Sequence, residues 1–365
     1  MVTYPKDWEE ATIGKLFDVS AGGDVKKHCF SKQRTLTCRY EVFSNSIDNR
    51  GLYGYTSMPV FYGNALTVTA RGTIGHAFYR ENDFDAIIRL LVLSPKNSEI
   101  KPKFYEYYIN GKVEFERENT GVPQLTAPKI KTKVVPFLSG IEQEKIIEIL
   151  QCIDTHIANL TELIEKKKAI RDGALEDLVS GRMRLEGFHD AWENTSIGGI
   201  LTILHGRNQR GVESFAGKYP ILGTGGVIGK ATQYLCDWEC VLIGRKGTID
   251  KPMYMNVPFW TIDTLYYSKP KANQCVKYQY YLFCTIDWYS YTESSGRPSL
   301  AKKVIEGIKI QMPKFDEQKA IVEVLSSMDA EITSLEEEKE KMLQIKVGAM
   351  DDLLTGRVRL TRQGG

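Results

Sequence analysis

The chain has 365 residues, of which 42% are hydrophobic and 26% are charged, and its formal net charge is +2. This composition is typical of a folded protein and excludes disordered, collagen-like and disulfide-scaffold classes. At about 150 residues per domain, the length predicts two domains with separate cores. No apolar run in the sequence reaches the roughly 18 residues of a membrane-spanning helix, and no secretory leader is recognisable. Seven Cys without a Cys-x-x-Cys pair favour a reduced, cytoplasmic setting.

The charge is unevenly distributed along the chain. Residues 1–140 carry a net charge of +4 and residues 181–315 carry +6, whereas residues 141–180 carry −4 and residues 316–355 carry −7. The two basic blocks are compatible with a polyanionic partner. The two acidic blocks are repelled by phosphate and are therefore free for other contacts.

Residues 1–140 are predicted to form a mixed globular domain, and residues 181–315 repeat its features. Short β-like runs alternate with Gly-rich turns, and Tyr and Phe are frequent, as in half-buried strands. The clearest β-like runs are Ala65–Thr69, Ile87–Leu93 and Cys240–Ile243.

Each of these domains is followed by a segment that predicts one long helix. The 38 residues from Ile141 to Leu178 contain no Pro, and their apolar residues recur at alternating spacings of four and three, the period of a coiled-coil seam. Gly181 and Gly356 predict C-terminal caps. A 38-residue helix spans about 57 Å and cannot bury its apolar stripe alone, so we expect the two helices to pair. The predicted pairing residues are Ile146, Leu150, Ile153, Ile157, Leu160, Ile164, Ile321, Leu325, Met328, Ile332 and Leu335.

The chain is an internal repeat, because a series of motifs recurs in the same order 173 to 184 residues later. The matched pairs are Trp8-Glu9 with Trp192-Glu193, Ile13-Gly14 with Ile197-Gly198, Arg71-Gly72-Thr73-Ile74 with Lys246-Gly247-Thr248-Ile249, Tyr105-x-Tyr107-Tyr108 with Tyr278-x-Tyr280-Tyr281, Pro123-x-Leu125 with Pro298-x-Leu300, Glu142-Gln143 with Glu317-Gln318, and Gly181-Arg182-x-Arg184-Leu185 with Gly356-Arg357-x-Arg359-Leu360. If the halves are pseudo-symmetric, the two ends of the chain should be neighbours.

The doubled order of these motifs, with the Pro5-x-x-Trp8 opening, resembles the DNA specificity subunit of Type I restriction-modification systems over nearly the whole chain. The resemblance implies an α+β fold. Two similar target recognition domains would be separated by two long antiparallel, coiled-coil-like helices in a pseudo-two-fold repeat. The expected boundaries are 1–140 and 181–315 for the recognition domains, 141–180 and 316–356 for the spacer helices, and 357–365 for the tail.

The resemblance also implies a non-catalytic subunit of a methyltransferase and restriction complex. Each recognition domain would read one half of a split, asymmetric site on double-stranded DNA. The helices would set the distance between the halves and dock two methyltransferase subunits, through which restriction subunits join. Those partners would methylate adenine at N6 with their own S-adenosylmethionine, so no cofactor, metal or membrane contact is expected in this chain.

Candidate DNA contacts lie in loops at matching places of the two halves. Arg and Lys suit guanine or phosphate, whereas Asn and Gln suit adenine. Gln124 and Arg297 occupy nearly equivalent places, so the halves would differ in base preference there. Solvated loops and tight Gly turns are the alternative interpretation. The candidates are Lys26, Lys27, Arg71, Thr73, Gln124, Arg207, Asn208, Gln209, Arg210, Arg245, Lys246, Thr248, Arg297 and Ser299.

Other motifs are assigned structural roles. The Tyr-rich segments 105–108 and 278–281 are expected in the core. Asp316 and Glu317 are interpreted as the acidic first turn of a helix, and Cys236-x-x-x-Cys240 offers no zinc ligand set. No methyltransferase, nucleotide-binding or Walker A motif is complete, so catalysis by this chain is not expected. The alternatives that stay open are a coiled-coil scaffold whose duplicated domains bind peptide or carbohydrate, and an enzyme with an unrecognised site.

Overall fold

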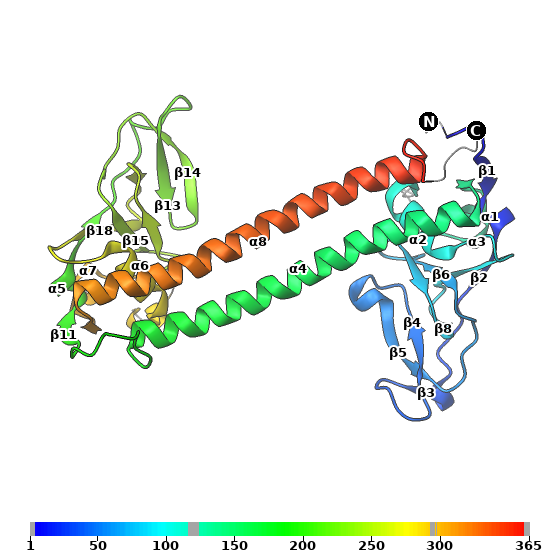
Figure 1. Ribbon diagram of the computed structural model, residues 1–365, viewed down its shortest axis with the longest axis horizontal. Coiled ribbons are helices and arrows are strands. Elements are labelled where there is room, and N and C mark those ends of the chain that lie inside the picture. Colours follow the sequence, from blue (N-terminus) through cyan, green and yellow to red (C-terminus); the bar gives the residue numbers. More distant parts are fainter. Residues whose placement is uncertain (1–3, 116–123, 293–295, 297, 361–365) are drawn as a thin grey trace. The chain divides into compact units, whose positions relative to one another are not determined.

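The computed structural model describes residues 4–115, 124–292, 296 and 298–360 (Figure 1). The chain divides into two compact units, one of Met1–Leu160 with Glu338–Gly365 and one of Thr161–Glu337. The first unit contains β1 (Glu9–Thr12), α1 (Ile13–Leu16), β2 (Phe17–Ala21), the 3-10 turn η1 (Lys27–Cys29), β3 (Phe30–Ser31), β4 (Tyr40–Phe43), η2 (Asp48–Gly51), β5 (Leu52–Thr56), β6 (Ala65–Val68), β7 (Ala77–Arg80), β8 (Phe84–Ala86), β9 (Leu91–Pro95), α2 (Pro102–Lys112), α3 (Ala127–Lys131) and β10 (Val134–Phe137). The second unit contains β11 (Glu193–Ser196), α5 (Ile197–Ile200), β12 (Leu201–His205), β13 (Tyr219–Gly223), β14 (Gly226–Ala231), β15 (Cys240–Gly244), β16 (Met253–Met255), β17 (Trp260–Thr261), β18 (Leu265–Pro270), α6 (Val276–Thr285), η3 (Trp288–Tyr291), α7 (Lys302–Gly307) and β19 (Lys309–Met312). Two long helices, α4 (Gly140–Ser180) and α8 (Phe315–Thr355), each contribute to both units.

The two units share one sheet topology. In the first, an antiparallel sheet has the order β2-β9-β6-β7, and the second has β12-β18-β15-β16. A smaller sheet places β4 between β5 and β8, just as β13 lies between β14 and β17, and in both the last pairing is parallel. The two-stranded pair β1-β10 corresponds to β11-β19. The motif repeat in the sequence is therefore a repeat of fold.

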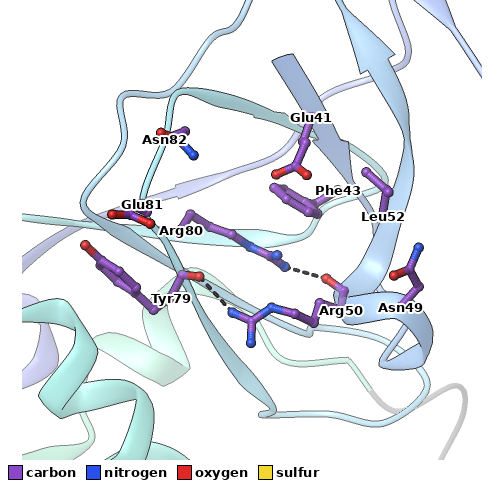
Figure 2. A pocket seen from close by; sticks show the side chains of 9 residues that line it. All are labelled: Glu41, Phe43, Asn49, Arg50, Leu52, Tyr79, Arg80, Glu81 and Asn82. Atoms are coloured by element: carbon purple, nitrogen blue, oxygen red, sulfur yellow. Dashed lines mark hydrogen bonds between the residues drawn. The ribbon is translucent and has the colours of Figure 1, made fainter. Parts of the chain in front are cut away.

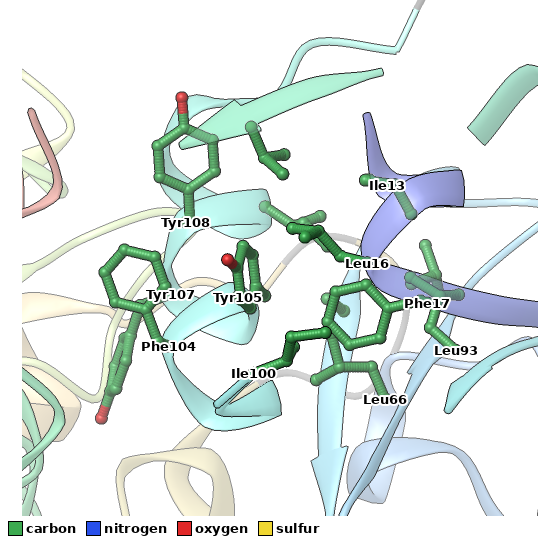
Figure 3. Packing of buried hydrophobic residues seen from close by; sticks show 14 of the residues in the cluster. Ile13, Leu16, Phe17, Leu66, Leu93, Ile100, Phe104, Tyr105, Tyr107 and Tyr108 are labelled. Atoms are coloured by element: carbon green, nitrogen blue, oxygen red, sulfur yellow. The ribbon is translucent and has the colours of Figure 1, made fainter. Parts of the chain in front are cut away.

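The core of the first unit is built on helix α2. Figure 3 shows Ile13, Leu16 and Phe17 beside the ring of Tyr105, and the Phe17 and Tyr105 rings meet edge to face at 5.2 Å between centroids. Tyr105 is fully buried, and its hydroxyl donates to the Pro136 carbonyl at 3.0 Å. The Pro136 carbonyl gives the buried Tyr105 hydroxyl a hydrogen-bond partner, while burial of the aromatic ring stabilises the fold. The predicted core role of the Tyr-rich segment is confirmed.

The core of the second unit repeats this arrangement on helix α6. Tyr278 and Tyr281 are fully buried there, together with Trp288, whose indole N–H donates to the Phe283 carbonyl at 2.9 Å. Aromatic residues spaced along one helix thus supply several of the large, fully buried side chains in each unit.

One predicted strand begins later than expected. The run Ile87–Leu93 was expected to be extended throughout, but β9 begins at Leu91. Ile88 and Arg89 adopt positive φ values of 56° and 61°, and their N–H groups donate to the carbonyls of Gly23 and Gly22. A β-branched residue is rare in this conformation, which the neighbouring chain imposes here through hydrogen bonds.

The long helices run antiparallel to one another within each unit. In the first unit, Asp154 of α4 pairs with Lys346 at 2.6 Å and His156 pairs with Glu338 at 3.2 Å. In the second unit, Lys167 pairs with Glu331 at 2.6 Å and Arg171 with Asp329 at 2.8 Å. In both units the residue number of the α8 partner falls as the residue number along α4 rises.

A search of the described helices for a membrane span found none with the required length and hydrophobicity.

The predicted seam residues differ in what they pack against and in how deeply they are buried. Ile146 and Leu150 belong to the core of the first unit, and Ile321 and Leu325 to that of the second, so these ends of the stripe pack on the globular domains. Those buried to 9% exposure or less are Ile146, Leu150, Leu160, Ile164, Ile321, Leu325 and Ile332. The half-buried ones are Ile153, Ile157, Met328 and Leu335.

Three of the repeated motifs meet at one buried carboxylate in the first unit. The Trp8 indole N–H donates to Glu142 at 3.2 Å, and the Arg359 guanidinium donates to Glu142 at 2.7 Å. Arg359 also binds Asp7 at 2.7 Å, which brings the N-terminal and C-terminal segments together as the pseudo-symmetry predicts. Glu142 is only 2% exposed, so these donors compensate the burial of its charge.

The second unit has the same contact made by residues close in sequence. Trp192 donates to Glu317 at 3.1 Å, and Arg184 donates to Glu317 at 2.6 Å. Glu317 lies in the first helical turn, as predicted, but it is 2% exposed and serves as the acceptor for these two donors. Gly181 and Gly356 follow α4 and α8 with φ values of +74° and +72°, which confirms the predicted caps.

Candidate nucleic-acid interface

In the second unit, the loop after β12 is fixed by backbone contacts to the segment that joins β17 and β18. The Gly206 N–H donates to the Leu265 carbonyl at 3.1 Å, and the Arg207 N–H donates to the Thr261 carbonyl at 2.8 Å. The Trp260 indole N–H donates to the Arg207 carbonyl at 2.9 Å. The backbone of this loop is therefore held while the side chains of Arg207, Asn208 and Arg210 are exposed.

A second loop, after β15, lies against the same joining segment. The Arg245 N–H donates to the Thr264 carbonyl at 2.9 Å, and the Arg245 Nη1 donates to the Asp263 carbonyl at 3.2 Å. On its other side, the loop pairs with the segment around Ser299: Lys246 bridges to Ser299, and the Leu300 N–H donates to the Arg245 carbonyl at 2.9 Å. The structure thus brings together four predicted contacts, Arg245, Lys246, Thr248 and Ser299.

The first unit holds its loops by the corresponding bonds. The Gly22 N–H donates to the Leu90 carbonyl at 2.7 Å, the Gly23 N–H to the Ala86 carbonyl at 3.1 Å, and the Leu125 N–H to the Ala70 carbonyl at 2.9 Å. The last of these bonds places Gln124 beside the Arg71–Thr73 turn, and the first two anchor the chain that leads to Lys26 and Lys27.

The Arg-Gly-Thr and Lys-Gly-Thr turns depend on their glycines. Gly72 and Gly247 have φ values of +71° and +90°, a region in which an L side chain is strained. The resulting turn leaves Arg71 and Lys246, one residue earlier, exposed to solvent in both units. The predicted tight turn is thus present, and it is compatible with a contact to DNA.

The cations of these loops form no ion pair with a carboxylate of the described residues. Within the ranges that the structure describes, no carboxylate oxygen lies within 4.0 Å of these side chains, which are Lys26, Lys27, Arg71, Arg207, Arg210, Arg245 and Lys246. A polyanion approaching them would not need to displace an internal ion pair. The exposed candidates are Lys26, Lys27, Arg71, Thr73, Gln124, Arg207, Asn208, Arg210 and Lys246, and the half-buried ones are Gln209, Arg245, Thr248 and Ser299. Arg297 lies outside the described residues.

Sequence reasoning missed a side chain that links two loops of the first unit. The Asn45 amide donates to the Ile88 carbonyl at 2.5 Å, and its Oδ1 accepts the Ala70 N–H at 2.6 Å. Asn45 therefore fixes the start of the Arg71 turn against the Ile88–Arg89 bend, where Arg89 is exposed. In the second unit a backbone carbonyl, that of Thr264, takes this acceptor role, so the sequence repeat gives no signal for Asn45.

The first unit also contains a pocket of about 250 Å³ with two arginines in its wall (Figure 2). The Arg80 guanidinium lies over the Phe43 ring, 3.4 Å from its centroid, and donates to Thr67 Oγ1 at 2.9 Å and to the Arg50 carbonyl at 2.7 Å. Burial lowers the pKa of Arg80 to about 9. These bonds tie Arg80 to β6 and to η2, so this buried side chain supports the fold.

The cysteines and acidic groups do not assemble a metal site in the described part of the chain. Cys236 and Cys240 are both buried, with their sulfurs 3.9 Å apart, in a cluster with Phe259 and Leu242. Their packing agrees with the structural role predicted from the sequence.

The family described as "Type I restriction modification DNA specificity domain" matches residues 5–169 and 189–344. The chain is 21% identical over 360 residues to a putative type I specificity subunit of Mycoplasma genitalium, covering 93% of this chain and 92% of the relative. It is 22% identical over 410 residues to the type I restriction enzyme MjaVIII specificity subunit of Methanocaldococcus jannaschii, covering 98% and 94%.

Solved structures show the same fold. The crystal structure of a type I restriction-modification S subunit from M. genitalium superposes with a TM-score of 0.68 at 20% identity, over 97% of each chain. An HsdS subunit from Thermoanaerobacter tengcongensis gives 0.54 at 11% identity, over 98% of each chain. The likeness in fold therefore extends over nearly the whole of this chain.

Proposed function

Because the chain belongs to the family of type I restriction-modification DNA specificity subunits, with two target recognition domains, we propose that each domain reads one half of a split site on double-stranded DNA. The observation that carries this proposal is the repeated framework of the loops. Corresponding backbone bonds hold Gly22 and Gly206, and Leu125 and Leu300, so each unit presents the same set of loops. The side chains on this shared framework differ, for example Gln124 in one unit and Ser299 in the other, which suits an asymmetric site.

Cationic side chains on these loops would hold phosphates, while amide and hydroxyl groups would meet base edges. Arg71 and Lys246 stand at equivalent turns and are the first candidates for phosphate contacts. Asn208 and Gln209 can pair with adenine, and Arg207 with guanine. Asn45 would act as a positioning residue, since its half-buried amide bonds to the backbone at Ala70 and Ile88 and so holds the Arg71 turn.

The paired helices would set the distance between the two half-sites and dock two methyltransferase subunits. Each helix has 41 residues and is therefore about 62 Å long. Their acidic character disfavours contact with phosphate and leaves their surface for protein partners. S-adenosylmethionine and the transfer of its methyl group to adenine N6 would belong to those partners, and restriction subunits would join through them. In this proposal the chain carries out no chemistry itself.

The proposal is tested by selecting random duplexes with the chain and its methyltransferase partner, and by sequencing methylated adenines in cells that carry the chain. Enrichment of two base clusters at a fixed gap is the expected result. Recovery of duplexes without sequence preference would instead favour a scaffold whose domains bind peptide or carbohydrate. Turnover by the isolated chain would reveal an enzyme.

A matched pair of variants refines this test. Lys246→Ala should weaken binding to all sequences and lower the slope of log affinity against log salt by about 0.9, the value for one lost phosphate contact. Lys341→Ala is the control, because Lys341 is an exposed cation on helix α8. Equal salt-dependence slopes for the two variants would show that Lys246 does not contact DNA.

A further inference from the structure

Two large apolar side chains are completely exposed. Among the described residues, Leu36 and Phe215 have relative exposures of 100% and 106%, and the next large hydrophobic side chain, Tyr62, has 84%. We call Leu36 and Phe215 the apolar tips. Neither contributes to the cores of the units, so the fold does not account for their apolar character.

The apolar tips occupy equivalent places in the two recognition domains. Leu36 lies six residues before Val42 of β4, which pairs in parallel with Asp85, and Phe215 lies six residues before Ile221 of β13, which pairs in parallel with Trp260. The sheets with β4 and β13 extend away from the long helices in their own units (Figure 1). The correspondence emerges only from strand pairing, because Leu36 and Phe215 belong to none of the repeated motifs.

Each apolar tip is presented by a hydrogen-bonded turn with a hydroxyl residue just before it. The Cys38 N–H donates to Thr35 Oγ1 at 2.9 Å, and the Thr35 N–H donates to the Cys38 carbonyl at 3.1 Å. In the second domain, the Gly217 N–H donates to the Ser214 carbonyl at 3.0 Å, and the Ser214 N–H donates to the Lys230 carbonyl at 2.9 Å. The tip backbone is therefore ordered before any partner arrives, which reduces the entropy lost on binding.

The surroundings of the apolar tips are cationic. Lys32, Arg34 and Arg39 flank Leu36, with no acidic residue between Phe30 and Tyr40. Arg34 and Arg39 line a pocket that Glu41 and Asp83 also line, without an ion pair to either carboxylate among the described residues. Arg210 and Lys218 flank Phe215 along the chain, against one carboxylate, Glu213, and Lys230 adjoins it through the bond to Ser214. Across the described residues, none of these six cations forms an ion pair. An apolar tip that several cations flank along the chain is complementary to a duplex, whose phosphates flank grooves with apolar base surfaces.

We propose that Leu36 and Phe215 are DNA-contact residues, each of which enters a groove of its own half-site and packs against the bases while the neighbouring cations hold phosphates. This inference rests on the proposed function, because it assigns further specificity-determining residues to the same two domains. Burial of a Leu or Phe side chain against bases would recover the free energy that its exposure to water costs in the free protein. Phe and Leu are also the side chains that proteins insert between base steps.

The test measures binding of the full-length chain to a labelled duplex that carries the bipartite site found by methylation sequencing. Leu36→Ala and Phe215→Ala should each weaken binding about tenfold without changing the salt dependence, since no phosphate contact is lost. Val347→Ala is the matched control, because Val347 is 70% exposed on helix α8. All three variants should retain the wild-type melting temperature, as their side chains are exposed.

Scrambled duplexes distinguish the possible outcomes. When one half-site is scrambled, the effect of Leu36→Ala should disappear, and with the other half-site scrambled, that of Phe215→Ala should disappear. Losses no larger than that of Val347→Ala would overturn the inference while leaving the proposed function intact. Unchanged DNA binding with weaker methyltransferase binding would also overturn it, and would assign the tips to a protein interface. A wild-type chain without preference for the intact duplex would overturn the proposed function as well.

Discussion

Arg359, which follows the end of α8, donates its Nε–H to Glu142 in the first turn of α4 at 2.7 Å. The same guanidinium binds Asp7, so one side chain joins the segment after α8, the segment before β1 and the start of α4. In the second unit, Arg184 and Glu317 make this contact at 2.6 Å without involving a chain terminus. The first recognition domain is thus completed by residues from both ends of the chain.

Replacement of Arg359 by Ala should destabilise the first unit. The Glu142 carboxylate is 2% exposed and would lose its cation, which should lower the free energy of unfolding by roughly 2–4 kcal/mol. Urea denaturation measures the change. The control is Arg357→Ala, whose partners are the surface residues Asp351 and, at 3.0 Å, Asp352, and whose loss should cost at most about 0.5 kcal/mol. Equal losses for the two variants would contradict the role assigned to the buried contact.

The contact with Asp7 should make stability depend on pH. The Arg359 guanidinium holds the pKa of Asp7 below its ordinary range. A carboxylate whose pKa is lowered by folding stabilises the protein above its ordinary pKa, and this contribution disappears as the pH falls through the folded-state value. The melting temperature of Asp7→Asn should therefore lie below that of the wild type near neutral pH and approach it in acid, as the pH falls through the folded-state pKa of Asp7. A difference that stays constant with pH would refute this linkage.

The long helices should owe their stability to apolar packing rather than to their ion pairs. Leu325 is fully buried, so Leu325→Ala should lower the free energy of unfolding by about 2–5 kcal/mol. Lys167 pairs with Glu331 on the surface, and Lys167→Ala should change stability by no more than about 0.5 kcal/mol. Thermal and urea denaturation compare the two. A larger loss of stability for Lys167→Ala than for Leu325→Ala would contradict the dominance of apolar packing.

Lengthening both helices should lengthen the gap in the DNA site. Insertion of one heptad in α4 after Leu160 and one in α8 before Glu338 preserves the seam period and adds about 10 Å to each helix. At about 3.4 Å per base pair, the gap should grow by about three base pairs while the half-sites stay unchanged. Sequencing of the methylated adenines measures the gap between the half-sites. An unchanged gap would show that the helices do not set the spacing.

Much of this architecture can be predicted from the sequence because it depends on local patterns. The absence of Pro and the apolar spacing of four and three predicted α4 to within a few residues of Gly140–Ser180, and Gly181 marked its end. The doubled order of motifs predicted two units of one fold. The prediction failed at Ile87–Leu90, where hydrogen bonds to the carbonyls of Gly22 and Gly23, distant in sequence, impose a bend on residues that locally favour a strand.

The chain's sequence by itself determined the repeat, the long helices, the aromatic cores and the loops that carry cations, since each follows from periodicity, composition or local turn chemistry. Only the tertiary structure decided how Trp8, Glu142 and Arg359 converge, how Asn45 braces the Arg71 turn, and which exposed apolar residues are equivalent. Those relationships join residues that are far apart along the chain. Their geometry is fixed by strand pairing and by the requirement that buried polar groups find partners, neither of which a linear pattern records.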